Sequence, residues 1–554
     1  MSVHLTRRRF GATCAVLTTA LLLVACSGTA KSDPDGDPGA DSGAAYQISA
    51  TTPEPTGDID AFTWSLYAEP LSLAYPYAFD YPPNTVLSNV CESLLRWNAD
   101  LSISPGLASA VDNPDPRTWV YTIRDGVTFH SGGTLTADDV VASLNLHLDP
   151  QVGSYWASVY RNVKSIEKTG DMEVTVHLTK PDSMFNQYMA VSPGTIESAA
   201  FLEQAGADYG NPSTGVDCTG PFEFDSWTSG QSITLKKYDD YWDADLAARA
   251  GEVTFVFQSD PNTRVNAWQD GEVDGGWFVP SNAYERLSTS GPGSLYYGLN
   301  TTVVSQIVAN TDGPLGDPDV RKALLMATDR AGIVKAGEAG VAEISNSLVS
   351  KSTWGGLSAD EVEDIYAELP TYDYDVDKAK QLAADAGVDG QQIVIATSPI
   401  SVAADVIAQA TAQAGRDIGL DVTIKTVSPD QYTALFSSPA ARKGIDMFMT
   451  AWYTSLADPM EMYGVLQTGQ FSNYGSWSDP DFDAQTDQAI ADPIGEPART
   501  TAMVNAQAIA AEQLPWLPLY APPTTLWLGD RITGVAPSIY YMYYPWAATI
   551  GAKG

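Results

Sequence analysis

The chain has 554 residues, with 30 Lys and Arg against 68 Asp and Glu, and a formal net charge of -38. This excess of negative charge argues against binding to nucleic acid and to anionic lipid surfaces, because both repel an acidic protein. The chain is too long for one hydrophobic core, so we expect two or three lobes.

The N-terminus has the order of a bacterial secretion signal. A run of arginines ahead of Phe10, which also resembles a twin-arginine signal, precedes an apolar stretch at residues 11–25. This stretch is shorter than the roughly 20 residues that span a bilayer, which disfavours a transmembrane anchor. Leu-Val-Ala before Cys26 resembles a lipobox, in which the cysteine is acylated. We therefore expect residues 1–26 to be a lipoprotein signal peptide and Cys26 to anchor the exported protein by lipid to the outer face of the cell membrane.

Residues 27–55 are predicted to be a disordered tether. Up to residue 45 the sequence is almost entirely Ser, Gly, Ala, Pro, Asp and Thr, which cannot bury enough apolar surface to offset chain entropy. Alternating aspartates in this segment imitate the start of a calcium loop, but Pro38 and Ala44 stand where the loop needs Gly and a bidentate Glu. We expect no calcium there.

Beyond the signal peptide the chain has two cysteines, Cys91 and Cys218. In an exported protein such a pair is a candidate for a disulfide, with two buried free thiols as the alternative. The sequence has no CxxC motif. We therefore expect no metal site and no cofactor.

The first half of the chain mixes predicted strands and helices. Alternating apolar residues around an Asp-Gly pair predict a β-hairpin over residues 118–130. Thr136 and Asp139 have the spacing of a capping box, so a helix is expected from there to about residue 148. A half-buried strand is expected at residues 174–178.

The second half contains a strand-helix-strand unit. Strands are predicted at residues 393–396 and 422–427, with an Ala-rich helix at 403–418 between them, which implies parallel pairing. A further strand is expected at residues 445–453, and its end carries Trp452 and Tyr453. Ligands of open α/β sheets collect at the carboxyl ends of strands, so these aromatic side chains are candidates for a ligand site.

Several different short motifs follow one another along the chain in a characteristic order. They are Glu92-Ser93-Leu94-Leu95, Ile103-Ser104-Pro105-Gly106-Leu107-Ala108, Leu135-Thr136-Ala137-Asp138-Asp139-Val140, Thr219-Gly220-Pro221-Phe222, Tyr241-Trp242, Gly271-Glu272-Val273-Asp274, Tyr297-Gly298-Leu299-Asn300 and Val320-Arg321-Lys322-Ala323-Leu324. Each motif alone is weak, and most suit turns and packing better than ligand contacts. Together they resemble the family 5 extracellular solute-binding proteins, the oligopeptide, dipeptide and nickel binders of ABC importers.

The resemblance implies an α/β fold: a two-lobed periplasmic-binding-protein clamp with mixed sheets, a hinge between the lobes and an additional small domain. The implied divisions are residues 56–83 for the first part of lobe I, 84–200 for the small domain, 201–300 for the continuation of lobe I, 301–513 for lobe II and 514–554 for the return to lobe I.

The resemblance also implies a ligand site. In the peptide binders of the family a tryptophan is followed closely by an aspartate that pairs with the amino terminus of the ligand; here Trp452 stands at the tryptophan and Ser455 at the acid. This departure argues against an ordinary peptide with a free α-amino group. Asp458 matches a second family acid and is expected to be structural. The candidate ligand-binding residues are Trp452, Tyr453, Ser455, Tyr474 and the strand end with Tyr67 and Glu69.

A secreted hydrolase is the alternative from another functional class. The chain has only four His and lacks HExxH, GxSxG and a phosphate-binding glycine loop, so no catalytic residue stands out. We therefore expect a monomeric binding lipoprotein, not an enzyme, that captures a peptide or peptide-like solute in an inter-lobe cleft. It would deliver the solute to the permease and ATPase subunits of an ABC importer. The same clamp carrying an opine, an oligosaccharide or a metal chelate is the alternative within this class.

Overall fold

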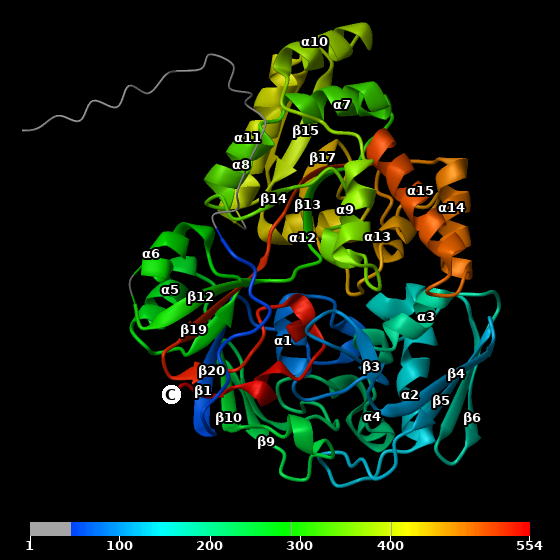
Figure 1. Ribbon diagram of the computed structural model, residues 1–554, viewed down its shortest axis with the longest axis vertical. Coiled ribbons are helices and arrows are strands. Elements are labelled where there is room, and N and C mark those ends of the chain that lie inside the picture. The colour runs from blue at the N-terminus through cyan, green and yellow to red at the C-terminus, as the bar shows by residue number, and fades with distance from the viewer. Residues whose placement is uncertain (1–45, 290, 400) are drawn as a thin grey trace, which may run out of the picture. The chain divides into compact units, whose positions relative to one another are not determined.

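The computed structural model describes residues 46–289, 291–399 and 401–554 (Figure 1). The predicted signal peptide, Cys26 and the first part of the predicted tether lie outside these residues. Among the described helices, none has the length and apolar character needed to cross a membrane.

The predicted tether extends too far along the chain. Thr52 Oγ1 donates to the carbonyl of Val535 at 3.0 Å, and the N–H of Ser49 donates to the carbonyl of Tyr297 at 2.7 Å. Residues 46–55 are therefore attached to the folded part by long-range hydrogen bonds. The prediction of a tether that reaches residue 55 is wrong at its C-terminal end, because composition alone did not reveal these partners.

Sheet I contains strands from both ends of the described chain. Its strand order is β12-β19-β11-β1-β10-β9-β8, with β1 parallel to β10 and to β11. The strands are β1 (Ile59–Leu66), β8 (Phe222–Thr228), β9 (Ser232–Lys237), β10 (Ala250–Phe257), β11 (Gly275–Trp277), β12 (Gly293–Gly298) and β19 (Thr524–Gly529). The chain thus leaves this sheet after β12 and returns to it with β19.

Sheet II contains the predicted parallel unit. Its order is β14-β18-β13-β17-β15-β16, and β15 is parallel to both β16 and β17. The strands are β13 (Val303–Val308), β14 (Glu343–Ile344), β15 (Gln392–Thr397), β16 (Asp421–Thr426), β17 (Met447–Trp452) and β18 (Trp516–Ala521). Helix α11 (Val402–Asp417) joins β15 to β16, so the predicted strand-helix-strand unit and the following strand are confirmed.

The two faces of sheet II pack against different helices. On β17, Met447 and Met449 point to one face and pack in the core that a first group of helices shares. Phe448 points to the opposite face and packs in the core that a second group of helices shares. The first group is α7 (Pro318–Ala327), α8 (Arg330–Gly337), α10 (Val376–Asp385) and α11, seen around β15 and β17 in Figure 1. The second group is α12 (Pro429–Ser437), α13 (Met460–Gly464), α14 (Pro480–Ala491) and α15 (Pro497–Gln513).

Sheet III has the order β4-β5-β7-β6, with strands β4 (Ala108–Asp115), β5 (Thr118–Ile123), β6 (Val163–Gly170) and β7 (Glu173–Leu178). The predicted hairpin over residues 118–130 is wrong. Both edges of β5 are already occupied, by β4 and by β7, so the segment after the Asp-Gly turn has no place beside it. The predicted strand at 174–178 is confirmed as β7.

The predicted helix after Thr136 is α2 (Ala137–Asn145), followed by a short 3-10 turn to Leu148. Its capping box is present, since the N–H of Thr136 donates to Asp139 Oδ2 at 2.9 Å. The remaining α-helices are α1 (Tyr81–Leu87), α3 (Ser183–Tyr188), α4 (Ala199–Ala205), α5 (Pro261–Gln269), α6 (Tyr284–Thr289) and α9 (Ala359–Ala367), and two short strand pairs are β2 (Leu95–Trp97) with β3 (Ile103–Pro105) and β20 (Ile532–Thr533) with β21 (Gly551–Ala552).

The return of the chain to sheet I begins later than residue 514. Strand β18 pairs with β13 and β14 and is therefore part of sheet II. The next strand, β19, pairs with β11 and β12 in sheet I. The crossing consequently lies between Ala521 and Thr524, because the sequence around Trp516 completes sheet II before the chain leaves it.

Candidate functional site

A row of aromatic rings begins at the carboxyl end of β17. Trp452, the last residue of this strand, is half-buried, and its ring centre lies 5.3 Å from that of Trp516. Trp516 in turn stacks against Tyr474, with ring centres 6.1 Å apart and ring planes at 3°. Two predicted site residues, Trp452 and Tyr474, are thus connected through a tryptophan that the sequence reasoning missed. We call these three side chains the Trp452 row.

Tyr453, which follows β17, contacts segments that are distant from it in the sequence. Its hydroxyl donates to the carbonyl of Phe79 at 2.6 Å, and its ring centre lies 4.9 Å from that of Tyr81. The hydroxyl of Tyr543, in the C-terminal segment, is 3.5 Å from the hydroxyl of Tyr453. Residues before α1, residues after β17 and residues near the C-terminus therefore meet here.

Tyr67 reaches the same group of rings through Phe278. The ring centre of Phe278 lies 5.5 Å from that of Tyr67 and 4.4 Å from that of Tyr81. Phe278 is 37% exposed and has a φ of 56°, a left-handed conformation that is unusual for a bulky residue. We call the group formed by Tyr67, Phe79, Tyr81, Phe278, Tyr453 and Tyr543 the aromatic cluster.

Glu69 does not join the aromatic cluster. Its carboxylate accepts the indole N–H of Trp227 at 2.8 Å and the backbone N–H of Gly230 at 3.0 Å. Trp227 lies near the end of β8, and Gly230 lies in the turn between β8 and β9. The structure thus brings Tyr67 to the predicted site and binds Glu69 elsewhere.

Ser455 is buried beside the aromatic cluster. Its hydroxyl lies 3.0 Å from the hydroxyl of Tyr543. The backbone N–H groups of Ser455 and Leu456 donate to the two carboxylate oxygens of Glu461 at 2.9 and 2.7 Å. A carboxylate is therefore present near position 455, but Glu461 of α13 supplies it, and no sequence motif indicated this residue.

The carboxyl group of Glu461 is buried and has a raised pKa. Burial raises the pKa of its carboxyl to about 7, although the two backbone hydrogen bonds oppose this shift. Within the described residues Glu461 forms no salt bridge. The carboxylate is accordingly stabilised by hydrogen bonds from the backbone of Ser455 and Leu456 and from the Ser455 side chain.

Asp458 has a different role from Glu461. Its Oδ2 accepts from Arg499 Nη2 and from Gln187 Nε2, both at 2.6 Å, and the side chains of Asp458 and Arg499 are each 4% exposed. A buried ion pair with its hydrogen bonds satisfied fixes the relative positions of α3, α15 and the loop after β17. This geometry agrees with the structural role expected for Asp458.

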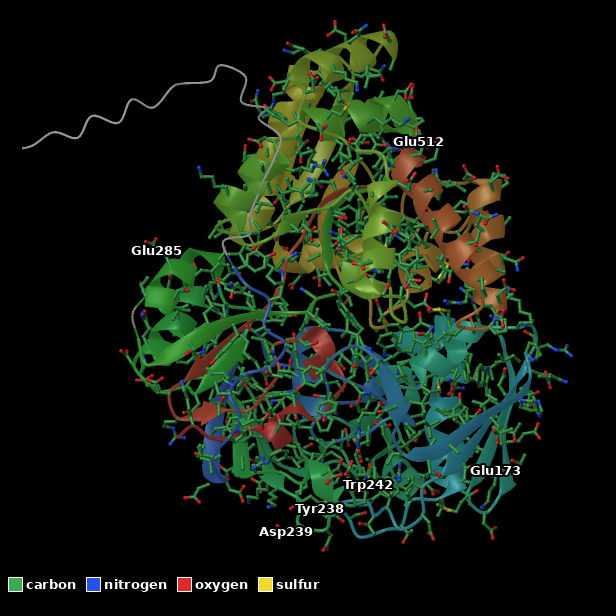
Figure 2. The ribbon with its side chains drawn as sticks, viewed as in Figure 1. Glu173, Tyr238, Asp239, Trp242, Glu285 and Glu512 are labelled. Atoms are coloured by element: carbon green, nitrogen blue, oxygen red, sulfur yellow. A yellow bond between two sulfur atoms is a disulfide. The ribbon has the colours of Figure 1, made fainter. Side chains whose placement is uncertain are left out.

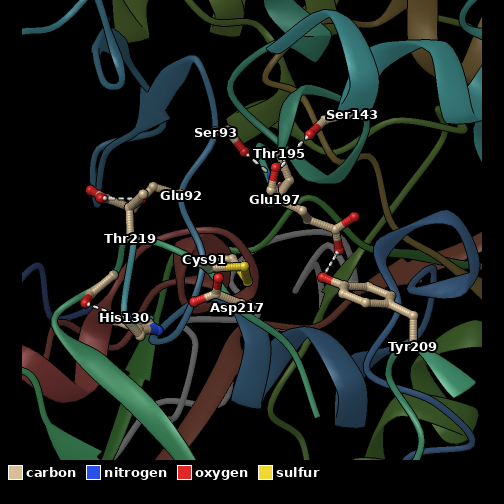
Figure 3. The surroundings of a disulfide bond; sticks show 12 residues. Cys91, Glu92, Ser93, His130, Ser143, Thr195, Glu197, Tyr209, Asp217 and Thr219 are labelled. Carbon is tan, nitrogen blue, oxygen red and sulfur yellow. Dashed lines mark hydrogen bonds between the residues drawn. A yellow bond between two sulfur atoms is a disulfide. The ribbon is translucent and has the colours of Figure 1, made fainter. Parts of the chain in front are cut away.

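Several motif residues surround the cysteines rather than the aromatic cluster. Cys91 and Cys218 are joined by a disulfide, with Cα atoms 4.8 Å apart (Figure 3). The neighbouring Glu92 accepts from the hydroxyl of Thr219 at 3.0 Å and from the indole N–H of Trp242 at 2.8 Å. Trp242, labelled in Figure 2, also lies under the guanidinium of Arg124 at 4.4 Å. We call Cys91, Cys218, Glu92, Thr219 and Trp242 the disulfide cluster.

Comparisons with known proteins agree with this architecture. The model of the bacterial extracellular solute-binding proteins, family 5, matches residues 102–474. The glutathione-binding protein GsiB of Salmonella paratyphi A is 26% identical over 459 residues, covering 80% of this chain and 86% of the relative. GsiB of Escherichia coli K12 is 25% identical over 456 residues, with the same coverage of 80% and 86%.

Solved structures share the fold. DppA from Helicobacter pylori in complex with the peptide STSA has a TM-score of 0.78 at 20% identity, covering 90% of this chain and 99% of the other. AppA from Bacillus subtilis with a nonapeptide has a TM-score of 0.76 at 21% identity, covering 90% and 100%. AgaA from A. tumefacien R10 with agropinic acid has a TM-score of 0.76 at 23% identity, covering 89% and 99%.

These findings confirm the α/β periplasmic-binding-protein fold with mixed sheets and an extra domain. They also decide between the two functional classes in favour of binding over hydrolysis, since the matched family consists of solute-binding proteins. The chain belongs to the family 5 bacterial extracellular solute-binding proteins, which bind a solute and work with ABC transporter components.

Proposed function

We propose that this protein captures a peptide or peptide-like solute between the Trp452 row and the aromatic cluster and delivers it to the permease and ATPase of an ABC importer. The observation that carries the proposal is the position of Tyr453. Tyr453 lies just after the carboxyl end of β17 in sheet II. Its hydroxyl donates a hydrogen bond to the carbonyl of Phe79, in the segment that joins β1 of sheet I to α1. A ligand held there would touch both lobes and stabilise their closure.

The names of the relatives support a peptide-like ligand. GsiB is named for binding glutathione, and DppA and AppA were solved with peptides. AgaA was solved with agropinic acid, which keeps an opine as the alternative. Aromatic walls suit all of these ligands, because a ring packs against apolar chains and planar groups alike.

Ser455 argues that the favoured ligand lacks an ordinary free α-amino group. A hydroxyl offers a neutral hydrogen bond, whereas a carboxylate at that position would offer a charged one, and charged hydrogen bonds contribute about 1.5–3 kcal/mol. The amide, acyl or modified amine of a peptide-like solute suits the hydroxyls of Ser455 and Tyr543, which lie 3.0 Å apart.

The experiment that tests the proposal is native mass spectrometry of protein purified from its own host. The expected result is a co-purified small ligand containing at least one amide bond, released on denaturation. A ligand without an amide bond would favour the opine or another non-peptide solute. Binding of no solute, either co-purified or from a panel of peptides and opines, would contradict the proposal.

Anchoring by Cys26 is a separate part of the proposal and can be tested by Cys26→Ser. A serine cannot carry the thioether-linked lipid, so we expect the variant to leave the membrane fraction or to stay unprocessed. Cell fractionation followed by intact-mass analysis measures both outcomes. Cys14→Ser, within the apolar stretch of the signal, is the matched control and should stay anchored. A processed Cys26→Ser protein retained on the membrane would refute the anchor.

A further inference from the structure

Phe278 follows β11, and its position in sheet I matches that of Tyr67. The strands β1 and β11 are neighbours and run parallel, so their carboxyl ends lie at the same edge of the sheet. Tyr67 comes directly after β1, and Phe278 comes directly after β11. Ligands of open α/β sheets collect at the carboxyl ends of strands, so Phe278 lies where a contact with the solute is expected.

The ring of Phe278 lies between two tyrosines of the aromatic cluster. Its plane makes an angle of 82° with the ring of Tyr67 and of 80° with the ring of Tyr81, so both contacts are edge-to-face. The residue is 37% exposed, which leaves part of the ring open to a ligand after both contacts are made. Tyr81 in turn contacts Tyr453, so the ring of Phe278 is connected to the end of β17 in sheet II.

The backbone of Phe278 has a conformation that suits glycine better than phenylalanine. Its φ of 56° is left-handed, and there the Cβ atom of an L-residue lies too close to the following carbonyl oxygen. Strained residues of this kind cluster at functional sites, where the surrounding structure holds them in place. A glycine at this position would relieve the strain and leave the space between Tyr67 and Tyr81 unfilled. The strain therefore accompanies a ring that fills this space.

Hydrogen bonds from the interior of sheet I hold the strained backbone. Arg264, which is 5% exposed, donates from Nη2 to the carbonyl of Phe278 at 3.4 Å and from Nη1 to the carbonyl of Gln258 at 3.2 Å. Gln258 follows β10, so the guanidinium joins the carboxyl ends of β10 and β11. The N–H of Val279 donates to Thr525 Oγ1 at 3.0 Å. The framework of the sheet thus sets the position from which the ring of Phe278 projects.

We infer that Phe278 is a specificity-determining residue, which limits the size of the solute at the sheet I end of the ligand site. Its ring fills the space between Tyr67 and Tyr81 that a further side chain of a peptide-like solute would need. The site therefore takes short peptide-like solutes and rejects those with an additional bulky residue at this end. This inference rests on the proposed function, because it sets the size of the solute that the Trp452 row and the aromatic cluster bind.

The test uses three probes without a free amine or carboxylate. N-acetyl-Ala-Tyr-amide is the short probe. N-acetyl-Phe-Ala-Tyr-amide and N-acetyl-Ala-Tyr-Phe-amide are the long probes, which add one phenylalanine at either end. Titration calorimetry should show that the wild-type protein binds the short probe at least about tenfold more tightly than one of the long probes, because a side chain forced into a filled site is costly.

Phe278→Gly should remove this discrimination. The variant opens a space that matches the added phenylalanine side chain, and its backbone adopts the left-handed φ freely. We expect it to bind the rejected long probe at least as tightly as the short one. Discrimination that persists unchanged in a folded Phe278→Gly protein would overturn the inference.

Two further variants separate the ring from the strain. Phe278→Ala removes the ring and keeps the strain, so it should accept the long probe but melt at a lower temperature than Phe278→Gly. A higher melting temperature of Phe278→Ala would overturn the strain on which the inference rests. Ala339, which is exposed and has a φ of 52°, provides the matched control, since Ala339→Gly relieves a left-handed residue without removing a ring. It should discriminate as wild type does; acceptance of the long probe would assign the effect to backbone flexibility and overturn the inference.

The remaining outcomes distinguish this inference from the proposed function. Equal affinity of the wild-type protein for all three probes, with binding weakened in Trp452→Ala, would overturn the size limit and leave the proposed function standing. Absence of binding of all three probes to the wild-type protein would also overturn the inference. The proposed function would fall only if the protein also carried no co-purified solute and bound nothing from the panel of peptides and opines.

Discussion

The disulfide cluster and the proposed ligand site differ in how many side-chain partners their charged groups have. In the disulfide cluster, the Glu92 carboxylate accepts from Thr219, Tyr241 and Trp242 and also pairs with Arg96. At the proposed ligand site, the Glu461 carboxylate accepts from the backbone N–H groups of Ser455 and Leu456, and among the described residues it forms no salt bridge. Most of the motif residues gather in the disulfide cluster, where the carboxylate has several side-chain partners. Few of them lie at the proposed ligand site, where the carboxylate has fewer such partners. Motifs that identify the family therefore mark its framework more than its ligand contacts.

The sharpest way to test this contrast is to remove the disulfide. The bond closes a loop with a sequence separation of 127 residues, and in the chain-entropy model such a loop contributes about 4–5 kcal/mol to the free energy of unfolding. We expect the double variant Cys91→Ala/Cys218→Ala to lose about that much, with ligand affinity unchanged in the molecules that fold. Urea unfolding and calorimetry measure the two quantities. Alkylation of wild-type protein without reductant should modify neither cysteine; two modified thiols would show that the bond does not form.

Removal of the Glu92 carboxylate should have the next largest effect. Glu92→Ala leaves Arg96 without this ionic partner and the Trp242 and Thr219 donors without their acceptor, and breaking a buried pair costs about 3–5 kcal/mol. Arg96 keeps Asp243 as a second partner, so we expect about 3 kcal/mol. Glu203→Ala, on the exposed side of α4, is the control and should change stability by less than about 0.5 kcal/mol. A similar small change in Glu92→Ala would erase the contrast between the two regions.

The pH dependence of stability offers a smaller effect. Glu197, near the disulfide cluster in Figure 3, is 1% exposed, and burial raises the pKa of its carboxyl from 4.5 to about 7. The folded state therefore holds more protons than the unfolded state between about pH 4.5 and pH 7, so stability is highest below this window and falls as pH rises through it. Glu338 and Glu461, with pKa values also raised to about 7, act in the same direction.

Glu197→Gln should remove the part of this pH-dependent loss of stability that the Glu197 carboxyl causes. Gln keeps an acceptor for the Tyr209 hydroxyl but cannot ionise, so we expect the loss of stability between pH 4.5 and pH 7.5 to shrink by about 2–3 kcal/mol. Denaturant titrations at several pH values in this range measure the slope. An unchanged slope would mean that the carboxyl is not the source of this part of the pH dependence.

The sequence predicted the local elements of this fold better than their long-range partners. The unit of β15, α11 and β16 was predictable because its strand ends, its helix composition and its order all lie within one short segment. The hairpin after β5 failed because the partners of β5 are β4 and β7, and no local pattern indicates which strands already occupy its edges. The return to sheet I was misplaced for the same reason.

The candidate site shows a similar division. Trp452, Tyr453 and Ser455 could be placed because the end of a parallel strand and a family motif coincide there. The other members could not be placed, because they come from distant parts of the chain and no motif marks them: Tyr81, Phe278, Tyr543, Trp516 and Glu461. Their convergence is a property of the folded chain, and the abundance of Trp and Tyr in the composition was the one available hint.

Trp452→Ala tests whether the Trp452 row and the aromatic cluster bind the solute. Titration calorimetry with the co-purified ligand should show a loss of at least about tenfold in affinity, because truncation of a central aromatic contact typically costs about 2 kcal/mol or more in binding. Tyr374→Ala, which removes a ring that is 59% exposed, is the control and should bind as wild type does. Both variants should melt as folded proteins. Unchanged affinity in a folded Trp452→Ala protein would show that the solute does not bind at the Trp452 row.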